Sequence, residues 1–246
     1  MTPEVLWSFG RIGNVSVSPD GSKAVYDITY FNKEEDRGYS DLYLMNLPEG
    51  QTTRLTDTDY NESDAGWTPD GKFITYLAKG QLWEMNPDGS NPRQVTDIPD
   101  GINGYVYAPD MSKIVYLKDV QLEPTVQDLY PDLPKAKARI VDDQFYRHWN
   151  DWVDAYTHLF IADYVPAQPI TTGKDIMEGE RWESPVRPWG GVEQLAWTKD
   201  GKKLIYTCRK KIGIDYAEST NTDLYAYNTE NGETVNLTKG MMGYDK

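Results

Sequence analysis

Short stretches of alternating apolar and polar residues run along the chain, and one kind of turn joins pairs of them four times. Alternation with a period of two residues is typical of β-strands. Two such stretches joined by a short turn predict a β-hairpin. The four turns read SPDG, TPDG, APDM and TKDG and occupy residues 18–21, 68–71, 108–111 and 198–201.

The residue types in these turns predict a sharp reversal of the chain. Proline at the second position presets φ, aspartate at the third bonds nearby amides, and glycine at the fourth accepts the positive φ of a type I turn with a bulge. Met111 replaces glycine in the third copy, and a left-handed methionine costs about 1–2 kcal/mol. Lys199 replaces proline in the fourth copy. Because type I turns accept most residues at that position, we expect all four turns to form.

The spacing of the turns indicates a repeated β-sheet. The turn aspartates Asp20, Asp70, Asp110 and Asp200 are 50, 40 and 90 residues apart, and periods of about 40 to 50 residues are typical of propeller blades. Within a period the hairpin is followed by a third strand, a polar turn and a fourth strand. The sequence therefore predicts an all-β chain, residues 1–246, forming a partial β-propeller domain. Its four-stranded antiparallel blades cover about residues 14–57, 65–97, 105–173 and 193–239.

The interval of 90 residues indicates an insertion within the third blade. Only one stretch in this interval reads as a third strand, so an insertion fits better than a fifth, degenerate blade. The insertion covers about residues 120–157, and its first part has three prolines and no sustained helical period, which predicts a loop with at most a short helix. A second irregular stretch, residues 171–191, leads into the fourth blade. Long loops of this kind are often functional.

Composition favours the same class and argues against several partners. The chain has 18 Tyr and 8 Trp against 5 Phe, a bias towards side chains that suit half-buried strand surfaces. Lys and Arg total 25 and Asp and Glu total 39, giving a formal charge of −14. We expect no nucleic-acid partner, because phosphates require a basic surface. We also expect no membrane partner, because an anionic membrane surface would repel the chain.

The sequence lacks the patterns of common catalytic and metal sites. The nucleophile elbow of hydrolases requires Gly-x-Ser-x-Gly, which does not occur. Without a nucleophile, His148 and His158 are expected to be structural or interface histidines. The sequence has no Cys/His cluster and no glycine-rich phosphate loop, and residues 57–68 depart from a calcium loop at its sixth and twelfth positions. We expect no metal and no cofactor, and we interpret the single cysteine, Cys208, as a buried strand thiol.

Three segments carry a resemblance to a known family. They are the opening TPEVLWSFGRIGNVSVSPDGSKAVY, the strand pair DLYLMNLPEGQTTRLTD and, above all, ARIVDDQFYRHWNDWVD before HLFIADY. They resemble the N-terminal β-propeller of prolyl oligopeptidase family serine peptidases, of the dipeptidyl peptidase or acylaminoacyl peptidase type. The hairpins are shared with TolB-like propellers, whereas RHWNDW is more specific. Asn150 stands where relatives commonly have Asp, so the role of that carboxylate is not transferred.

The resemblance implies a propeller of seven or eight blades that covers a C-terminal α/β-hydrolase domain with the catalytic Ser, Asp and His. The chain ends at TKGMMGYDK, where a further blade would be expected to open, so we interpret it as a fragment without catalytic residues. Its expected function is to gate access and to orient peptide substrates for the hydrolase domain, in a periplasmic or secreted parent protein. The alternative is a stand-alone TolB-like scaffold that binds another protein.

The candidate substrate-binding residues lie in the insertion and are Asp142, Asp143, Arg147 and His148. A carboxylate binds an ammonium group, and Arg binds a carboxylate in two-pronged geometry, so this segment could hold the charged ends of a peptide. The resemblance implies that acids of the propeller capture the peptide amino terminus, but the paired glutamate of relatives is absent. The alternative is a salt-bridged insertion that packs on the hydrolase domain, with Trp149 and Trp152 as packing anchors.

A partial ring also predicts self-association. The outer faces of the first and last blades would lack neighbouring blades and would expose apolar strand residues. Burial of several hundred Å2 at about 25 cal/mol per Å2 would favour association by several kcal/mol before entropy is subtracted. Four blades that close on themselves would instead form a monomer.

Overall fold

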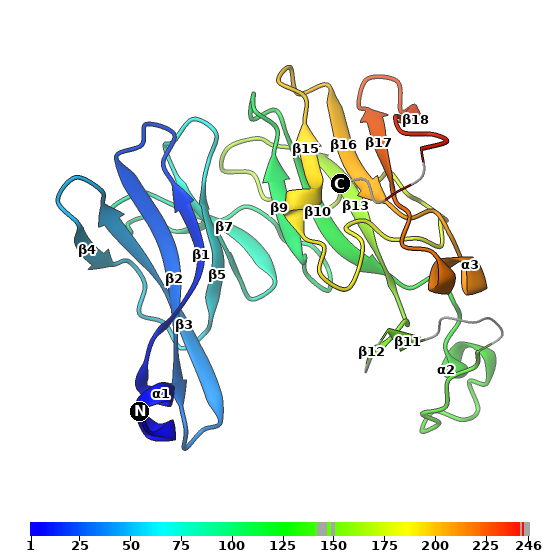
Figure 1. Cartoon of the computed structure of the whole chain (residues 1–246), viewed down its shortest axis with the longest axis horizontal. Helices are drawn as coiled ribbons and strands as arrows, with labels where there is room; N and C mark the ends of the chain where they lie inside the picture. The colour runs from blue at the N-terminus through cyan, green and yellow to red at the C-terminus, as the bar shows by residue number, and fades with distance from the viewer. Residues whose placement is uncertain (142–146, 149–150, 242, 244–246) are drawn as a thin grey trace. The chain divides into compact units, whose positions relative to one another are not determined.

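The computed structural model of the chain describes residues 1–141, 147–148, 151–241 and 243 and contains four four-stranded sheets (Figure 1). The first is β1 (Arg11–Val17), β2 (Lys23–Asn32), β3 (Arg37–Asn46) and β4 (Gln51–Arg54). The second is β5 (Glu62–Trp67), β6 (Ile74–Ala78), β7 (Gln81–Met85) and β8 (Arg93–Gln94). The third has the order β14-β13-β10-β9, with β9 (Gly104–Tyr107), β10 (Lys113–Val120), β13 (Tyr156–Asp163) and β14 (Lys174–Asp175). The fourth is β15 (Leu195–Trp197), β16 (Lys203–Cys208), β17 (Asp223–Asn228) and β18 (Thr234–Asn236).

The remaining described elements are short. They are the helices α1 (Pro3–Ser8), α2 (Val126–Leu129), α3 (Gly213–Glu218) and the 3-10 turn η1 (Val192–Gln194), and a hairpin of β11 (Arg147–His148) with β12 (Asp151–Trp152). The prediction of an all-β chain with four four-stranded antiparallel sheets is confirmed. Within the described part of the chain, no helix is long and apolar enough to cross a membrane.

Each predicted turn closes the hairpin between the first two strands of its sheet. The amide of the fourth turn residue donates a hydrogen bond to the carbonyl of the first turn residue. The distance is 2.8 Å where the donor is Gly21, Gly71 or Gly201, and 2.9 Å where it is Met111. All four residues have positive φ, and Met111 adopts φ 58° in place of glycine. The turn aspartate accepts the amide of the residue after the turn at 3.0–3.2 Å in every copy. The side chain of the third turn residue therefore closes each hairpin.

The chain divides into two compact units, residues 1–114 with 162–173 and residues 115–161 with 174–246. In the first unit, apolar side chains of the first and second sheets form one core. Its members are Val25, Leu42, Leu44, Ala65, Ile74, Tyr76, Ala78 and Met85. Core members occupy alternate positions of a strand, such as Ile74, Tyr76 and Ala78 of β6, as the period-two pattern predicts. Thr75 and Leu77, which lie between them, are also buried, so β6 is covered on both faces.

A buried carboxylate ties distant parts of the first unit together. The side chain of Glu84 is fully buried and accepts two hydrogen bonds from Arg93, at 2.9 Å from Nε and 2.6 Å from Nη2. The hydroxyl groups of Tyr107 and Tyr164 also donate to it, at 2.6 and 2.9 Å. Four charged or polar donors thus compensate the loss of water around this carboxylate.

The segment 162–173 completes the first unit although it follows the insertion in sequence. Ile170 forms a parallel bridge with Thr96, its amide donates to the carbonyl of Val95 and its carbonyl accepts the amide of Asp97, both at 2.8 Å. The second sheet is therefore extended by residues that lie far along the chain.

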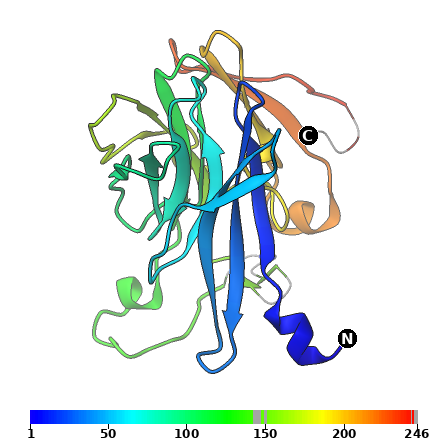
Figure 2. The same ribbon diagram turned by 90° about the vertical axis from the view of Figure 1, so that its left-hand side faces the viewer.

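The β2–β3 hairpin is the longest of the first unit, and α1 lies beside its far end (Figures 1 and 2). The rings of Trp7 and Phe31 meet edge to face with centroids 5.3 Å apart, and the guanidinium of Arg11 lies over both rings. Aromatic and cation–π contacts therefore hold the short helix against the hairpin.

In the second unit, the fourth sheet, β13 and β10 supply many of the buried apolar residues. Leu159, Leu204, Tyr206 and Cys208 are each at most 1% exposed. Burial raises the pKa of the Cys208 thiol well above its usual range, so this thiol stays protonated and unreactive. The interpretation of Cys208 as a buried strand thiol agrees with this position. The first part of the insertion contains only the short helix α2, whose capping box is formed by Thr125 and Asp128.

Candidate functional site

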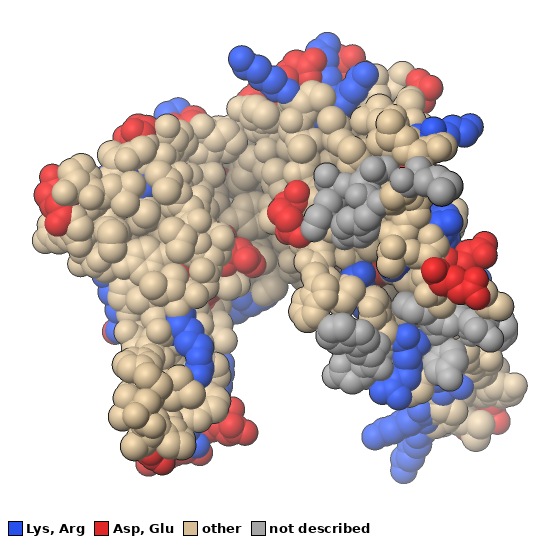
Figure 3. Space-filling model, in the orientation of Figure 1, with Lys and Arg blue, Asp and Glu red and all other residues tan. Residues whose placement is uncertain are grey.

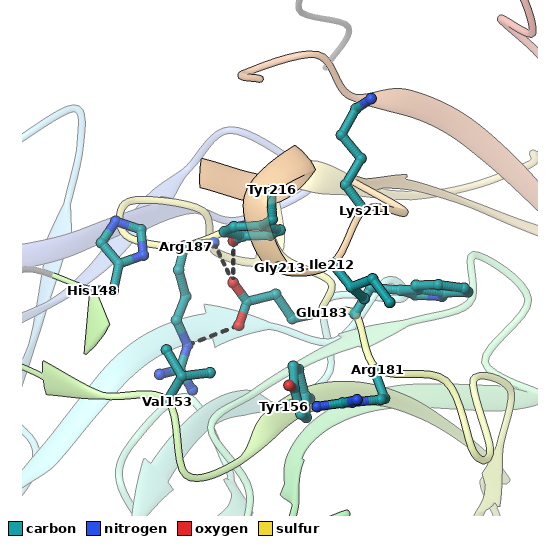
Figure 4. Close-up of a pocket in the computed structure, with 11 residues that line it drawn as sticks. His148, Val153, Tyr156, Arg181, Glu183, Arg187, Lys211, Ile212, Gly213 and Tyr216 are labelled. Atoms are coloured by element: carbon teal, nitrogen blue, oxygen red, sulfur yellow. Dashed lines mark hydrogen bonds and ion pairs between the residues drawn. The ribbon is translucent and has the colours of Figure 1, made fainter. Parts of the chain in front are cut away.

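A hollow in the second unit collects residues from the insertion, from the irregular stretch before the fourth sheet and from α3 (Figure 4). The space in it that the centre of a water molecule can reach is about 50 Å3, within about 480 Å3 of empty space that includes open solvent. Its lining residues are His148, Val153, Tyr156, Arg181, Trp182, Glu183, Arg187, Lys211, Ile212, Gly213 and Tyr216. Aromatic and aliphatic side chains share this lining with a histidine, two arginines, a lysine and a glutamate, so the hollow is more polar than a typical small-ligand site.

Glu183 is the only carboxylate among these lining residues, and its side chain is 7% exposed. The hydroxyl of Tyr216 donates to Oε1 at 2.8 Å, and Arg187 Nε forms an ion pair with Oε2 at 3.0 Å (Figure 4). Within the described residues, Oε2 has no hydrogen-bond donor in good geometry. Burial raises the pKa of Glu183, while the hydrogen bond from Tyr216 and the charge of Arg187 lower it in part.

Backbone contacts of the irregular stretch fix the position of Arg187. The amide of Gly190 donates to the carbonyl of Val186 at 3.0 Å, and the side chain of Gln194 accepts the amide of Val186 at 2.9 Å. A Cβ atom at position 190 would lie 2.4 Å from the Val186 carbonyl oxygen. Only glycine therefore permits this turn, which places Arg187 opposite Glu183.

Tyr216 is held from behind by a buried arginine. The guanidinium carbon of Arg209 lies 3.6 Å from the centroid of the Tyr216 ring, and Nη1 donates to the carbonyl of Ser219 at 3.1 Å. Arg209 is 8% exposed. The cation–π contact orients the ring whose hydroxyl group donates to Glu183.

The candidate substrate-binding residues of the sequence analysis fall into two groups. His148 lines the hollow, and its charge acts to lower the pKa of Glu183. The guanidinium of Arg147 lies 5.0 Å from the ring centroid of Trp152, with which it is paired across the β11–β12 hairpin. Asp142 and Asp143 lie outside the described residues, as do Trp149 and Asn150.

Sequence reasoning missed Glu183, Arg187 and Tyr216. The available signal was weak: Glu183 and Arg187 lie in the second irregular stretch, residues 171–191, where Pro and Gly interrupt any period. Tyr216 lies 33 residues from Glu183, on the helix α3 that no pattern indicated. The contact between them depends on tertiary structure.

A second hollow adjoins the first and shares Val153, Tyr156 and Arg181 with it. It is formed by residues around α2 and by residues 136–141 of the insertion. Arg139 pairs with Asp154 at 2.8 Å, and Arg181 pairs with Glu123 at 2.9 Å. Basic side chains gather on this part of the visible face, at the lower right of Figure 3, although the chain as a whole is acidic.

The chemistry available in the first hollow is recognition by charge and hydrogen bonding. In the described part of the chain, no group of three or more His, Cys, Asp or Glu side chains could hold a metal ion. The Glu183–Arg187 pair presents an acceptor and a donor side by side. Such a pair suits a ligand that carries an N–H donor next to a carbonyl acceptor, as a peptide terminus does.

Relatives of the chain include peptidases. It is 41% identical over 249 aligned residues to dipeptidyl-peptidase 5 of Porphyromonas endodontalis and to that of Porphyromonas gingivalis, covering 100% of the chain and 36% of each relative. Dipeptidyl-peptidase 5 of Arthroderma otae is 26% identical over 223 residues, covering 83% of the chain and 30% of that relative. The chain thus spans little more than a third of the length of the Porphyromonas relatives. No family model matches it.

Solved structures share the fold. An acylaminoacyl peptidase from Pyrococcus horikoshii matches 95% of the chain with a TM-score of 0.66 and 15% identity, over 33% of the matched chain. TolB from Acinetobacter baumannii matches 91% of the chain with a TM-score of 0.51 and 16% identity, over 42% of the matched chain. The four sheets are therefore propeller blades of the TolB-like kind.

Proposed function

Since the whole chain is homologous to part of dipeptidyl-peptidase 5 and has the fold of the acylaminoacyl peptidase match, we propose that it is the propeller part of a prolyl oligopeptidase family serine exopeptidase. In this proposal the propeller gates access and orients peptides, while the hydrolase domain of the parent protein supplies the catalytic Ser, Asp and His. The parent protein acts in the periplasm or is secreted.

The first hollow is the site that orients the peptide, and the observation that carries this proposal is the state of Glu183. A buried acceptor with an incomplete set of hydrogen bonds costs up to about 1–3 kcal/mol. Glu183 Oε2 lies 3.0 Å from Arg187 Nε, but among the described residues it accepts no hydrogen bond in good geometry. The ammonium group of a peptide amino terminus has three N–H donors and the complementary charge. Binding of this ammonium group would satisfy Oε2 and remove the cost.

Arg187 takes the next polar group of the peptide in this proposal. Its side chain is 30% exposed, and its Nη2 lies 3.8 Å from Oδ1 of Asp119, beyond hydrogen-bond distance, so the Nη groups can donate to a ligand. The first carbonyl oxygen of a peptide lies beside the amino terminus and accepts hydrogen bonds. Glu183 and Arg187 would thereby read the start of a peptide without reference to its side chains.

The insertion also contributes residues to the site. His148 lines the hollow, and we propose that Asp142 and Asp143 contribute negative charge for the amino terminus and that Arg147 contacts a peptide carbonyl or carboxylate. Val153 and Tyr156 supply apolar surface in the same hollow.

Binding of short peptides to the purified chain tests the proposal. The probe is an unblocked dipeptide amide. The readout is calorimetry, supported by tryptophan fluorescence, to which Trp182 in the hollow contributes as one of eight tryptophans. Glu183→Gln removes a charged acceptor, which is worth about 1.5–3 kcal/mol, so the Kd should rise about 10- to 100-fold. The N-acetylated form of the same peptide should bind correspondingly weakly to the wild type, because it lacks the ammonium group.

A matched control is Glu230→Gln, which changes an exposed carboxylate of the same unit that pairs with Lys202. This variant should bind the dipeptide amide like the wild type. Equal affinity of wild type and Glu183→Gln, or equal affinity for free and N-acetylated peptides, would contradict the proposal. Self-association stays a prediction for light scattering, in which a dimer or larger species at micromolar concentration is the expected result.

A further inference from the structure

The buried histidine of β13 has two hydrogen-bond partners that can only accept. His158 is fully buried, and its Nδ1 lies 2.8 Å from Oδ2 of Asp175. Its Nε2 lies 2.9 Å from the backbone carbonyl oxygen of Glu180. A carbonyl oxygen never donates, and an ionised carboxylate donates no hydrogen bond either.

These contacts define the protonation state of the ring. A neutral imidazole carries one N–H group, whereas both contacts of His158 require a donor. The other oxygen of Asp175, Oδ1, accepts the amide of Met177 at 2.8 Å, a hydrogen bond that favours the ionised carboxylate. The geometry therefore fits an imidazolium paired with a carboxylate, a combination without net charge.

His158 and its neighbour Thr157 hold both ends of a short segment that lines the first hollow. Nε2 of His158 bonds the carbonyl of Glu180, and the carbonyl of Thr157 accepts the amide of Ser184 at 3.0 Å. Residues 181–183 lie between these two anchors, and all three line the hollow. The position of the Glu183 carboxylate thus depends on the hydrogen bonds made by two adjacent residues of β13.

Other charged and titratable groups surround this arrangement. The carboxylate of Glu180 is engaged by Lys210 at 2.8 Å and by the indole N–H of Trp182, so it does not compete for His158. Asp175 also acts on Tyr116 of β10, whose pKa is raised, chiefly by burial, to about 12. Cys208 of β16 stays a neutral thiol. Among the described residues, the charged side chain in contact with the ring is the carboxylate of Asp175.

We propose that His158 is a positioning residue for the peptide site: as an imidazolium it fastens residues 181–183, and loss of its proton releases them. Deprotonation leaves two acceptors facing each other at one of the two contacts, at Asp175 or at Glu180. That contact then becomes repulsive, and the segment that carries Glu183 loosens. The effect on peptide binding rests on the proposed function; the effect on the segment does not.

Asp175→Asn is the variant that separates this inference from a general loss of structure. The amide oxygen of Asn can keep the bond to the Met177 amide, while its NH2 group donates to a neutral Nδ1. A neutral His158 then satisfies both contacts, with Nε2–H still donating to Glu180. The variant should fold and should keep residues 181–183 in place when the ring of His158 is neutral.

The first measurement is NMR of the imidazole groups, which is simple because the chain has only two histidines. His148→Gln assigns the remaining signals to His158. We expect protons on both ring nitrogens of His158 at neutral pH in the wild type, and faster exchange of the Ser184 amide as the ring loses a proton. A His158 ring with a single proton at neutral pH, or a Ser184 exchange rate that ignores its titration, would overturn the inference.

The second measurement is the Kd of the dipeptide amide as a function of pH for the wild type and Asp175→Asn. The peptide amine titrates near pH 8, but this effect is common to both proteins and cancels in the ratio of their Kd values. The ratio should rise about tenfold for each pH unit above the titration of His158, because only the protonated form is competent. A constant ratio would overturn the inference and leave the proposed function intact. Failure of Glu183→Gln to weaken binding would overturn the proposed function instead, whatever the NMR result.

Discussion

The third hairpin turn carries a correctable strain, because Met111 occupies the left-handed conformation that glycine adopts in the other three turns. A side chain in this conformation costs about 1–2 kcal/mol. Replacement by glycine also frees the unfolded chain, at a cost of about 0.5–1 kcal/mol. Met111→Gly should therefore raise the free energy of unfolding by about 0.5–1 kcal/mol. For a chain of this size that corresponds to a rise in Tm of about 1–4 °C.

Two further variants isolate the backbone effect. Met111→Ala removes the side chain but keeps a Cβ in the left-handed region, so it should give no stabilisation. Gly21→Met places methionine in the corresponding turn of the first sheet, where φ is +73° and no atom lies within 4 Å of an added Cβ. It should lower the free energy of unfolding by about as much as Met111→Gly raises it.

Denaturation by urea, followed by circular dichroism, measures all three changes. We expect a higher free energy of unfolding for Met111→Gly than for the wild type and a lower one for Gly21→Met. Met111→Ala should be no more stable than the wild type. If Met111→Gly proves no more stable than Met111→Ala, the strain is not in the backbone and the reasoning fails.

Two other predictions concern buried and exposed carboxylates. Glu84→Gln removes the charge opposite the partly exposed Arg93 and should lower the free energy of unfolding by about 2–4 kcal/mol. Lys202→Ala breaks an exposed pair with Glu230 and should change the free energy of unfolding by less than about 1 kcal/mol. Equal effects of the two variants in urea denaturation would contradict the role of burial. The hydroxyl of Ser18, followed by the amide and hydroxyl of Ser22, lowers the pKa of Asp20 to about 2. A depressed pKa stabilises the folded state above the unfolded pKa of about 3.9, and this stabilisation is lost as the pH falls towards the folded pKa. In thermal denaturation, the advantage of wild type over Asp20→Asn should therefore be constant near neutral pH and shrink between about pH 4 and about pH 2. An advantage that persists undiminished at about pH 2 would contradict this assignment.

The parts of the fold that could be predicted from the sequence are those specified within a few residues. Turn residues such as Asp20 and Gly21 fix the conformation of their own turn, and the period-two pattern fixes which side of a strand is buried. The four sheets followed from these two signals. Even the left-handed conformation of Met111 could be anticipated, because the repeat supplies three glycine-containing copies for comparison.

The candidate site could be predicted only in part, because its groups are brought together by tertiary structure. His148 was singled out through the aromatic and charged insertion, and it lines the hollow. Glu183 lies in a stretch without periodicity, and its two partners come from the turn around Gly190 and from α3. Nothing in the local sequence distinguishes a glutamate that will be buried beside an arginine from one that will face water.

The return of residues 162–173 to the second sheet has a consequence for biosynthesis. Residues 1–114 leave the ribosome first, yet the backbone groups of Val95 and Asp97 find their partners only at Ile170. Domains tend to fold as they emerge, but this unit stays incomplete until the insertion and the segment through Gly173 have been synthesised. During that interval the edge next to β8 offers unpaired amide and carbonyl groups, which invite pairing with other nascent chains. Slower translation would lengthen the time during which this edge is exposed. A chaperone that covers strand edges should therefore raise the yield of soluble chain, most of all when translation is slow.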